Sequence, residues 1–124
     1  DEKRYNKIVK ACQLGRDLEI LEAGDLTQIG EKGVNLSGGQ KARLGIARAV
    51  YANRDIILMD DPLSALDAHV KKAIFDEVCC GELKNTTRVL VTHAVDFLDR
   101  VDRIIVINKG RVILNGSYKQ LENE

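Results

Sequence analysis

Hydrophobic residues recur at helical spacing in three stretches of the chain, and each stretch predicts an amphipathic helix. Gly15 suits the C-terminal end of the first helix, and Asp67 stands where the N-cap of the third helix belongs. The apolar stripes consist of Tyr5, Ile8, Val9 and Cys12, then of Leu44, Ala47 and Tyr51, and finally of Val70, Ala73, Ile74 and Val78.

Two apolar runs flank the third helix and predict strands. Ile56 to Met59 is apolar at every position, which indicates a strand covered on both faces, as in a parallel sheet between helices. Arg88 to Thr92 is β-rich and stops at His93. Strand, helix and strand in this order form a βαβ unit with a right-handed crossover. The predicted fold class is therefore α/β with a parallel sheet.

The last part of the chain has the pattern of a β-hairpin followed by a short helix. Ile104 to Ile107 and Val112 to Leu114 are joined through Asn108-Lys109-Gly110, a turn sequence that suits a hairpin. Ser117 and Gln120 then have the spacing of a capping box, which predicts the start of a last helix.

Composition and charge narrow the range of functions. Nineteen basic and nineteen acidic residues balance among 124, so no net charge attracts nucleic acid or an anionic membrane surface. No apolar run approaches the ~20 residues that span a bilayer. The three cysteines have neither disulfide nor zinc spacing, and we interpret them as reduced thiols without a function. Arg43 and Arg48 could steer phosphate, but solvation on a helix surface is the commoner role of such residues and is the interpretation we adopt for them. His69 is interpreted as a surface histidine.

Acidic residues and a histidine follow the two predicted strands at the point where each strand ends. Asp60-Asp61 follows the first strand and His93 the second, at the carboxyl edge where open α/β sheets bind ligands. Asp60 is suited to holding Mg²⁺ through water, with phosphates as further ligands. Asp61 is placed to orient an attacking water, and His93 to contact a terminal phosphate. The alternative for Asp60-Asp61-Pro62 is an ordinary turn.

A glycine-rich stretch from Glu22 to Gly39 predicts a long, irregular loop that leads into the second helix. At its end, Leu36-Ser37-Gly38-Gly39-Gln40 places a serine and two glycines where backbone N–H groups have no partner within the helix. Such an end binds anions, and glycine lets a phosphate approach the backbone closely. The alternative is a serine N-cap with a glycine-rich lead-in.

These segments resemble motifs of the ABC ATPases, in the order in which that family has them. Leu36 to Gln40 matches the signature motif, and Ile56 to Asp60 resembles the Walker B strand. Ser64-Ala65-Leu66-Asp67 resembles the D-loop and His93 the switch histidine. Thr27 to Gly33 resembles the loop that contacts the coupling helices of the membrane domain in exporters of this family.

The sequence from Asp60 to Val70 resembles that of the C subfamily, the multidrug-resistance-associated type, in its first nucleotide-binding domain. The resemblance implies the C-terminal half of a P-loop ATPase core in residues 53–124, and the signature-bearing end of its helical subdomain in residues 1–52. It implies ATP and Mg²⁺ as cofactors, with Asp60 on the metal and Asp61 and His93 as catalytic residues. The implied nucleotide-binding residues are Leu36, Ser37, Gly38, Gly39, Gln40 and Asp67.

The resemblance also implies partners and a location. In this family two such domains face each other head to tail, and the signature loop of one closes over ATP held by the Walker A loop of the other. The expected partners are therefore a second nucleotide-binding domain and the coupling helices of transmembrane domains, with no nucleic acid. The expected location is the cytoplasmic face of a membrane, as part of an integral membrane protein.

Two departures from the family pattern limit what the resemblance implies. No GxxxxGK[ST] occurs, because the nearest spacing, Gly33 to Gly38, is followed by Gly39 where lysine is required. We therefore expect a fragment of an exporter's ATP-hydrolysing module that is inactive when isolated. Asp61 stands where most of the family has the catalytic glutamate, which resembles the degenerate first site of C-subfamily transporters and argues against efficient hydrolysis there.

Two other functions fit the same motifs. One is a nucleotide-gated regulatory domain of a channel or receptor, which Asp61 favours weakly because hydrolysis would be secondary. The other is a soluble ABC ATPase that works on ribosomes or DNA. The balanced charge and the exporter-like segment from Thr27 to Gly33 argue against that soluble ATPase.

Overall fold

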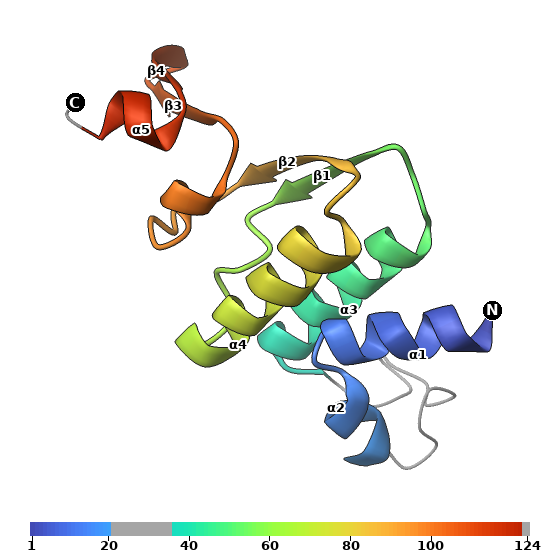
Figure 1. Cartoon of the computed structure of the whole chain (residues 1–124). Coiled ribbons are helices and arrows are strands. Elements are labelled where there is room, and N and C mark those ends of the chain that lie inside the picture. Colours follow the sequence, from blue (N-terminus) through green and yellow to red (C-terminus); the bar gives the residue numbers. More distant parts are fainter. Residues whose placement is uncertain (21–35, 123–124) are drawn as a thin grey trace. The chain divides into compact units, whose positions relative to one another are not determined.

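The computed structural model describes residues 1–20 and 36–122, which form two compact units, residues 1–92 and residues 93–124. No helix among the described residues is both long enough and apolar enough to cross a membrane. Figure 1 shows the elements in chain order: α1 (Glu2–Ala11), α2 (Gly15–Ile20), α3 (Gly38–Tyr51), β1 (Ile56–Asp60), α4 (Ala68–Ile74), η2 (Phe75–Glu82), β2 (Thr87–Val91), η3 (Leu98–Arg100), β3 (Ile104–Asn108), β4 (Arg111–Gly116) and α5 (Tyr118–Leu121).

The first predicted helix is shorter than expected and is followed at once by a second one. α1 begins after Asp1, whose carboxylate accepts a hydrogen bond of 3.0 Å from the N–H of Lys3, and it ends at Ala11. Gln13 adopts the left-handed backbone conformation in the turn, with φ +60°. The prediction that Gly15 ends the helix is therefore wrong, because Gln13 makes the turn and Gly15 begins α2.

α3 confirms the second predicted helix, and it begins at the two glycines after Ser37. Gly38 and Gly39 form the first turn of α3, so the predicted loop does not extend to them. Ile46, Ala47 and Val50 are buried along the face that packs on α1 and β1. The remainder of the predicted loop, including the exporter-like segment at residues 27–33, lies outside the described residues.

The predicted βαβ unit is present, with β1 and β2 parallel and Leu58 in register with Val89. Asp67 caps the connecting helix as predicted, since its carboxylate accepts from the N–H of Val70 at 2.9 Å. The helix changes from α4 into the wider π-helical segment η2, and the N–H of Leu83 donates to the carbonyl of Val78 at 2.9 Å. The predicted stripe faces the core, with Ile74 and Val78 fully buried.

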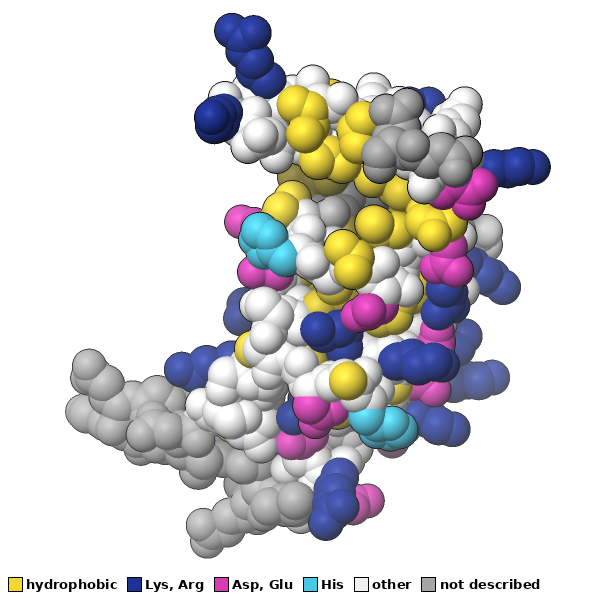
Figure 2. All heavy atoms as spheres, turned by 90° about the vertical axis from the view of Figure 1, so that its left-hand side faces the viewer, with side chains coloured by type: hydrophobic (Ala, Val, Ile, Leu, Met, Phe, Trp, Pro, Cys, Tyr) yellow, Lys and Arg dark blue, Asp and Glu magenta, His cyan; other side chains and the backbone are white. Residues whose placement is uncertain are grey.

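One face of the β1–β2 sheet is covered by helices and the other is not. Ile57 and Met59 are buried on the face where α3 and α4 lie in Figure 1. Ile56 and Leu58 remain 61% and 74% exposed on the other face. In the described residues of the first unit, the prediction of cover on both faces is thus wrong, because α3 and α4 lie on the same side of the two strands. Figure 2 shows exposed apolar side chains in yellow.

The second unit is the predicted hairpin with its short helix. β3 and β4 pair antiparallel, with an irregularity between Val106 and Ile107. Lys109 and Gly110 both have positive φ, +52° and +76°, which is the combination that a two-residue type I′ turn requires. Ser117 and Gln120 form the predicted capping box at the start of α5, with hydrogen bonds of 2.8 and 3.2 Å.

All three cysteines are free, as predicted. Burial raises the pKa of the Cys12 thiol to about 12, with the charge of Glu82 as a further cause. Burial likewise raises the pKa of Cys79 to about 11. Both side chains therefore stay protonated at neutral pH and act as small apolar core residues.

The contrast between the helical core and the exposed face of the sheet gives a stability prediction. Ile74→Ala should lower the free energy of unfolding of the chain by about 2–5 kcal/mol, because Ile74 is fully buried and the substitution leaves a cavity. Leu58→Ala removes a side chain of similar size from the exposed face and should change the stability by about 0.5 kcal/mol or less. Urea unfolding of both variants would measure the difference. Equal losses would mean that Leu58 is buried in solution.

Candidate functional site

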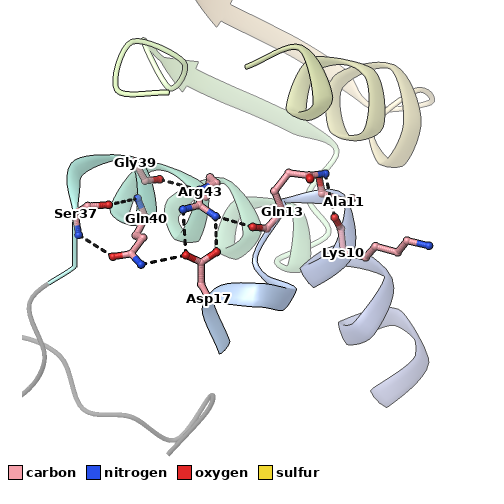
Figure 3. Close-up of polar contacts among 8 residues, drawn as sticks. All are labelled: Lys10, Ala11, Gln13, Asp17, Ser37, Gly39, Gln40 and Arg43. Carbon is pink, nitrogen blue, oxygen red and sulfur yellow. Dashed lines mark hydrogen bonds and ion pairs between the residues drawn. The ribbon is translucent and has the colours of Figure 1, made fainter. Parts of the chain in front are cut away.

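The start of α3 carries the residues that the signature resemblance singles out. Ser37 is the N-cap, and its hydroxyl oxygen accepts a hydrogen bond of 3.1 Å from the N–H of Gln40. The side-chain carbonyl of Gln40 accepts in return from the N–H of Ser37 at 2.8 Å (Figure 3). The serine N-cap alternative is therefore confirmed as local structure. It is compatible with anion binding, because the hydroxyl of Ser37 still has its own proton to donate.

The two glycines of this turn keep their backbone N–H groups available. They occupy the first two helical positions, where an intrahelical acceptor does not exist, and no partner for them is found among residues 1–20 and 36–122. Leu36 precedes the cap and is half-buried. The helix dipole adds partial positive charge at the same place. The start of α3 thus has the donors of an anion site.

The segment that resembles the D-loop packs directly on these glycines. A Cβ added to Gly39 would lie 3.3 Å from the carbonyl oxygen of Ala65, and one added to Gly38 would lie 3.8 Å from the Cβ of Ala65. Leu66 is buried beside them. Two motifs that are 24 or more residues apart in sequence are therefore in contact, and glycine at position 39 permits the close approach.

The two carboxylates at the end of β1 have different environments. Asp60 is the last residue of the strand and is exposed. Asp61 is half-buried and has φ +51°, a left-handed conformation that aspartate tolerates better than most residues. The N–H of Asp61 donates to the carbonyl of Val91 at 2.7 Å, and its carbonyl accepts from the hydroxyl of Ser64 at 3.3 Å. The ordinary turn is present here too, and it fixes the backbone of Asp61.

The other predicted site residues lie at solvent-exposed positions. Asp67 is exposed, and its carboxylate is engaged as the N-cap of α4. His93 is exposed and begins the second unit, two residues after the end of β2. His69 is exposed on α4, as predicted. Among the described residues, no three or more His, Cys, Asp or Glu side chains gather in an arrangement that would hold a metal ion by themselves.

The sequence interpretation missed two residues that support the start of α3. Arg43 is not a solvated surface residue, because its guanidinium forms an ion pair with Asp17 and both side chains are largely buried (Figure 3). The side-chain amide of Gln40 also donates to Asp17, at 3.0 Å. No local signal would have found this pair, because Asp17 and Arg43 are 26 residues apart and belong to different helices. Arg48 is exposed, as expected.

Comparison with known proteins identifies the family. The ABC transporter family model matches residues 3–64. The chain is 56% identical over 123 residues to ATP-binding cassette sub-family C member 2 of Homo sapiens. The matched region covers 98% of this chain and 8% of that protein. It is 51% identical over 124 residues to the ABC-type transporter cicA of Emericella nidulans, covering 100% of this chain and 9% of that protein.

A further relative is ABC transporter C family member 8 of Dictyostelium discoideum, 56% identical over 124 residues, with 98% of this chain and 8% of that protein covered. The chain thus spans less than a tenth of the length of these relatives. The family model includes the start of α3 and the end of β1, where the predicted site residues lie. The chain belongs to the ABC transporter family and is a segment of its ATP-binding module.

Proposed function

We propose that this chain is the C-terminal part of the first nucleotide-binding domain of an ABC exporter, a domain that couples ATP binding and hydrolysis to transport across a membrane. The observation that carries the proposal is the start of α3, where two glycine N–H groups and a serine hydroxyl are available to an anion. Residues 1–52 are the signature-bearing part of the helical subdomain. Residues 53–124 belong to the ATPase core.

The signature residues act on ATP that is held by a partner domain. Ser37 and Gly38 donate hydrogen bonds to the terminal phosphate when the two domains close head to tail, and Gly39 and Gln40 shape that turn. The packing of Ala65 on the glycines supports a joint movement of the signature and the D-loop, to which Asp67 belongs, toward the partner. Stabilisation of phosphate charge by oriented donors is the largest contribution that such a loop makes to the reaction.

The end of β1 serves the other nucleotide site, which is completed by a Walker A loop outside these residues. Asp60 is suited to Mg²⁺, because this ion takes one or two carboxylates together with water and phosphate oxygens and does not need a cluster of protein ligands. Mg²⁺ would neutralise charge on the phosphates there. Asp61 orients the attacking water, and His93 contacts the terminal phosphate.

The partners of the chain follow from the same proposal. A second nucleotide-binding domain supplies the opposite half of each ATP site, and the coupling helices of transmembrane domains receive the motion. The location is the cytoplasmic face of a membrane. The match to the ABC transporter family and the relatives cicA and C family member 8, both ABC transporters, support this assignment.

A regulatory role is the second candidate, and Asp61 is the observation that favours it. Aspartate is one methylene shorter than the glutamate usual in the family, so its carboxylate ends about 1.5 Å further from the water. Hydrogen bonds to Val91 and from Ser64 restrain the backbone of Asp61 and oppose a shift that would compensate for the shorter side chain. A site that holds ATP for long without hydrolysing it is suited to gating.

Ser37→Asp separates the phosphate-donor role of Ser37 from its capping role. Aspartate caps helices as well as serine does, so the stability should be unchanged. Its negative charge replaces the donor, and ATP hydrolysis at the site closed by this signature should fall by about 100-fold or more. Hydrolysis and thermal unfolding of the full-length protein would measure the two effects.

The matched control is Ser117→Asp, which makes the same substitution in the capping box at the start of α5, where the hydrogen bonds have nearly the same lengths. It should leave hydrolysis at its original rate. A Ser37→Asp variant that folds normally and retains full turnover would disprove the phosphate-donor role.

Asp61→Glu should raise hydrolysis at the site built on this domain's own motifs and shorten the time for which nucleotide stays there. A displacement of about 1 Å costs ~100-fold in rate, so restoring the length of the side chain should recover a large part of that factor. The initial ATP affinity should change little. Single-turnover hydrolysis and nucleotide trapping, with the partner site inactivated, would measure both quantities.

Asp55→Glu is the control for Asp61→Glu, since Asp55 is exposed at the opposite end of β1. A slight loss of stability is expected only for Asp61→Glu, because glutamate tolerates positive φ less well than aspartate. Unchanged rate and occupancy would mean that Asp61 serves only the turn before Pro62.

A further inference from the structure

The side chain of Gln40 makes two hydrogen bonds that depend on each other. Its carbonyl oxygen accepts from the N–H of Ser37 at 2.8 Å, and its NH₂ group donates to a carboxylate oxygen of Asp17 at 3.0 Å. An ionised carboxylate only accepts hydrogen bonds, so Asp17 selects the NH₂ end of the amide. The carbonyl end must then face Ser37, as the capping box requires.

Arg43 fixes Asp17 in turn. Its guanidinium donates to both carboxylate oxygens of Asp17, at 2.5 and 3.2 Å, in a bidentate pair whose side chains are only 14% and 18% exposed. It also donates to the carbonyl of Gln13 at 2.6 Å and to that of Gly39 at 3.3 Å. Arg43 thereby joins the turn between α1 and α2 to the first turn of α3.

The charges of this pair lie next to the proposed phosphate site. Burial by itself raises the pKa of Asp17, but the hydrogen bonds from Arg43 and Gln40 and the positive charge of Arg43 lower this pKa below its usual value overall. Asp17 is therefore ionised at neutral pH, one glutamine amide away from the helix start. A carboxylate at that position repels phosphate unless a positive charge compensates it.

We propose that Asp17 and Arg43 are positioning residues for nucleotide at the signature turn. Asp17 orients the amide of Gln40, which holds Ser37 in its capping conformation. Arg43 compensates the negative charge of Asp17, so that this charge does not repel the phosphate. The two residues form an ion pair without net charge, which fixes the shape of the turn and adds no net charge to the site. This inference rests on the proposed function, because it needs ATP at the start of α3.

The test uses the sign of the charge that each substitution leaves behind. Arg43→Gln leaves the carboxylate of Asp17 uncompensated and should raise the KM for Mg-ATP by about two- to fivefold, with a smaller change in kcat. Asp17→Asn keeps an acceptor for Gln40 and leaves Arg43 uncompensated, so it should lower KM or leave it unchanged. The double variant Asp17→Asn/Arg43→Gln is neutral and should return KM to near its original value.

The measurement is the ATP dependence of hydrolysis by the full-length protein in lipid, at the site that this signature closes. Arg48→Gln removes a positive charge from an exposed position of the same helix and should have no effect. Arg43→Lys keeps the charge without the bidentate fork. Arg43→Lys should retain the original KM even if its melting temperature falls. It is the variant to measure if Arg43→Gln does not fold.

Two outcomes would overturn the inference. Single variants that shift KM in the same direction, or a double variant worse than either single one, would mean that the pair acts only through fold stability. These results differ from the one that would reject the proposed function. Rejection of that function would require a Ser37→Asp variant with full turnover. Loss of turnover in Ser37→Asp together with same-direction shifts in KM would reject the positioning role alone.

Discussion

Helix α3 is held at both ends, and the candidate site depends on that constraint. Near its C-terminal end, the guanidinium of Arg4 donates to the carbonyls of Val50 and Tyr51 at 3.0 and 2.9 Å and lies 4.8 Å from the centre of the Tyr51 ring. In its N-terminal half, the pair of Arg43 and Asp17 ties the helix to α2. With the apolar side of α3 buried between, the helix cannot shift along its axis without breaking one of these contacts. Its first turn is therefore presented at a fixed place.

Local patterns in the sequence predicted the elements well, but they did not predict long-range contacts. The helix at residues 38–51, the Asp67 cap, the parallel strands, the hairpin and both serine caps follow from spacing and turn chemistry within a few residues. The role of Arg43 depends on Asp17, 26 residues away, and no pattern around either residue indicates it. The prediction that Gly15 ends the first helix was wrong because glycine permits a helix end without requiring one. The roles of His93 and Asp60 remain predictions from the resemblance.

The continuous apolar pattern of β1 shows what a sequence pattern does and does not specify. Ile56 and Leu58 alternate with Ile57 and Met59, and all four are apolar, although only the second pair is buried in the described chain. The register continues the exposed face onto β2 through Val89 and Val91. Four adjacent apolar side chains at the surface make a patch that soluble domains normally cover. The pattern therefore suits a strand inside a larger domain, which agrees with the small part of its relatives that this chain spans.

The capping boxes at the starts of α3 and α5 show why a phosphate site needs more than the box itself. Ser37 with Gln40 and Ser117 with Gln120 have the same hydrogen bonds, at 2.8 and 3.1 Å and at 2.8 and 3.2 Å. α5 is four residues long and begins with Tyr118, so its dipole is small and a side chain stands at its first position. α3 is fourteen residues long and begins with two glycines, and its glutamine is held by Asp17 from another helix. The start of α3 has the physical properties of an anion site because a common local motif is combined there with three further features. These are the length of the helix, the two glycines without side chains, and the contact with Asp17 from another helix.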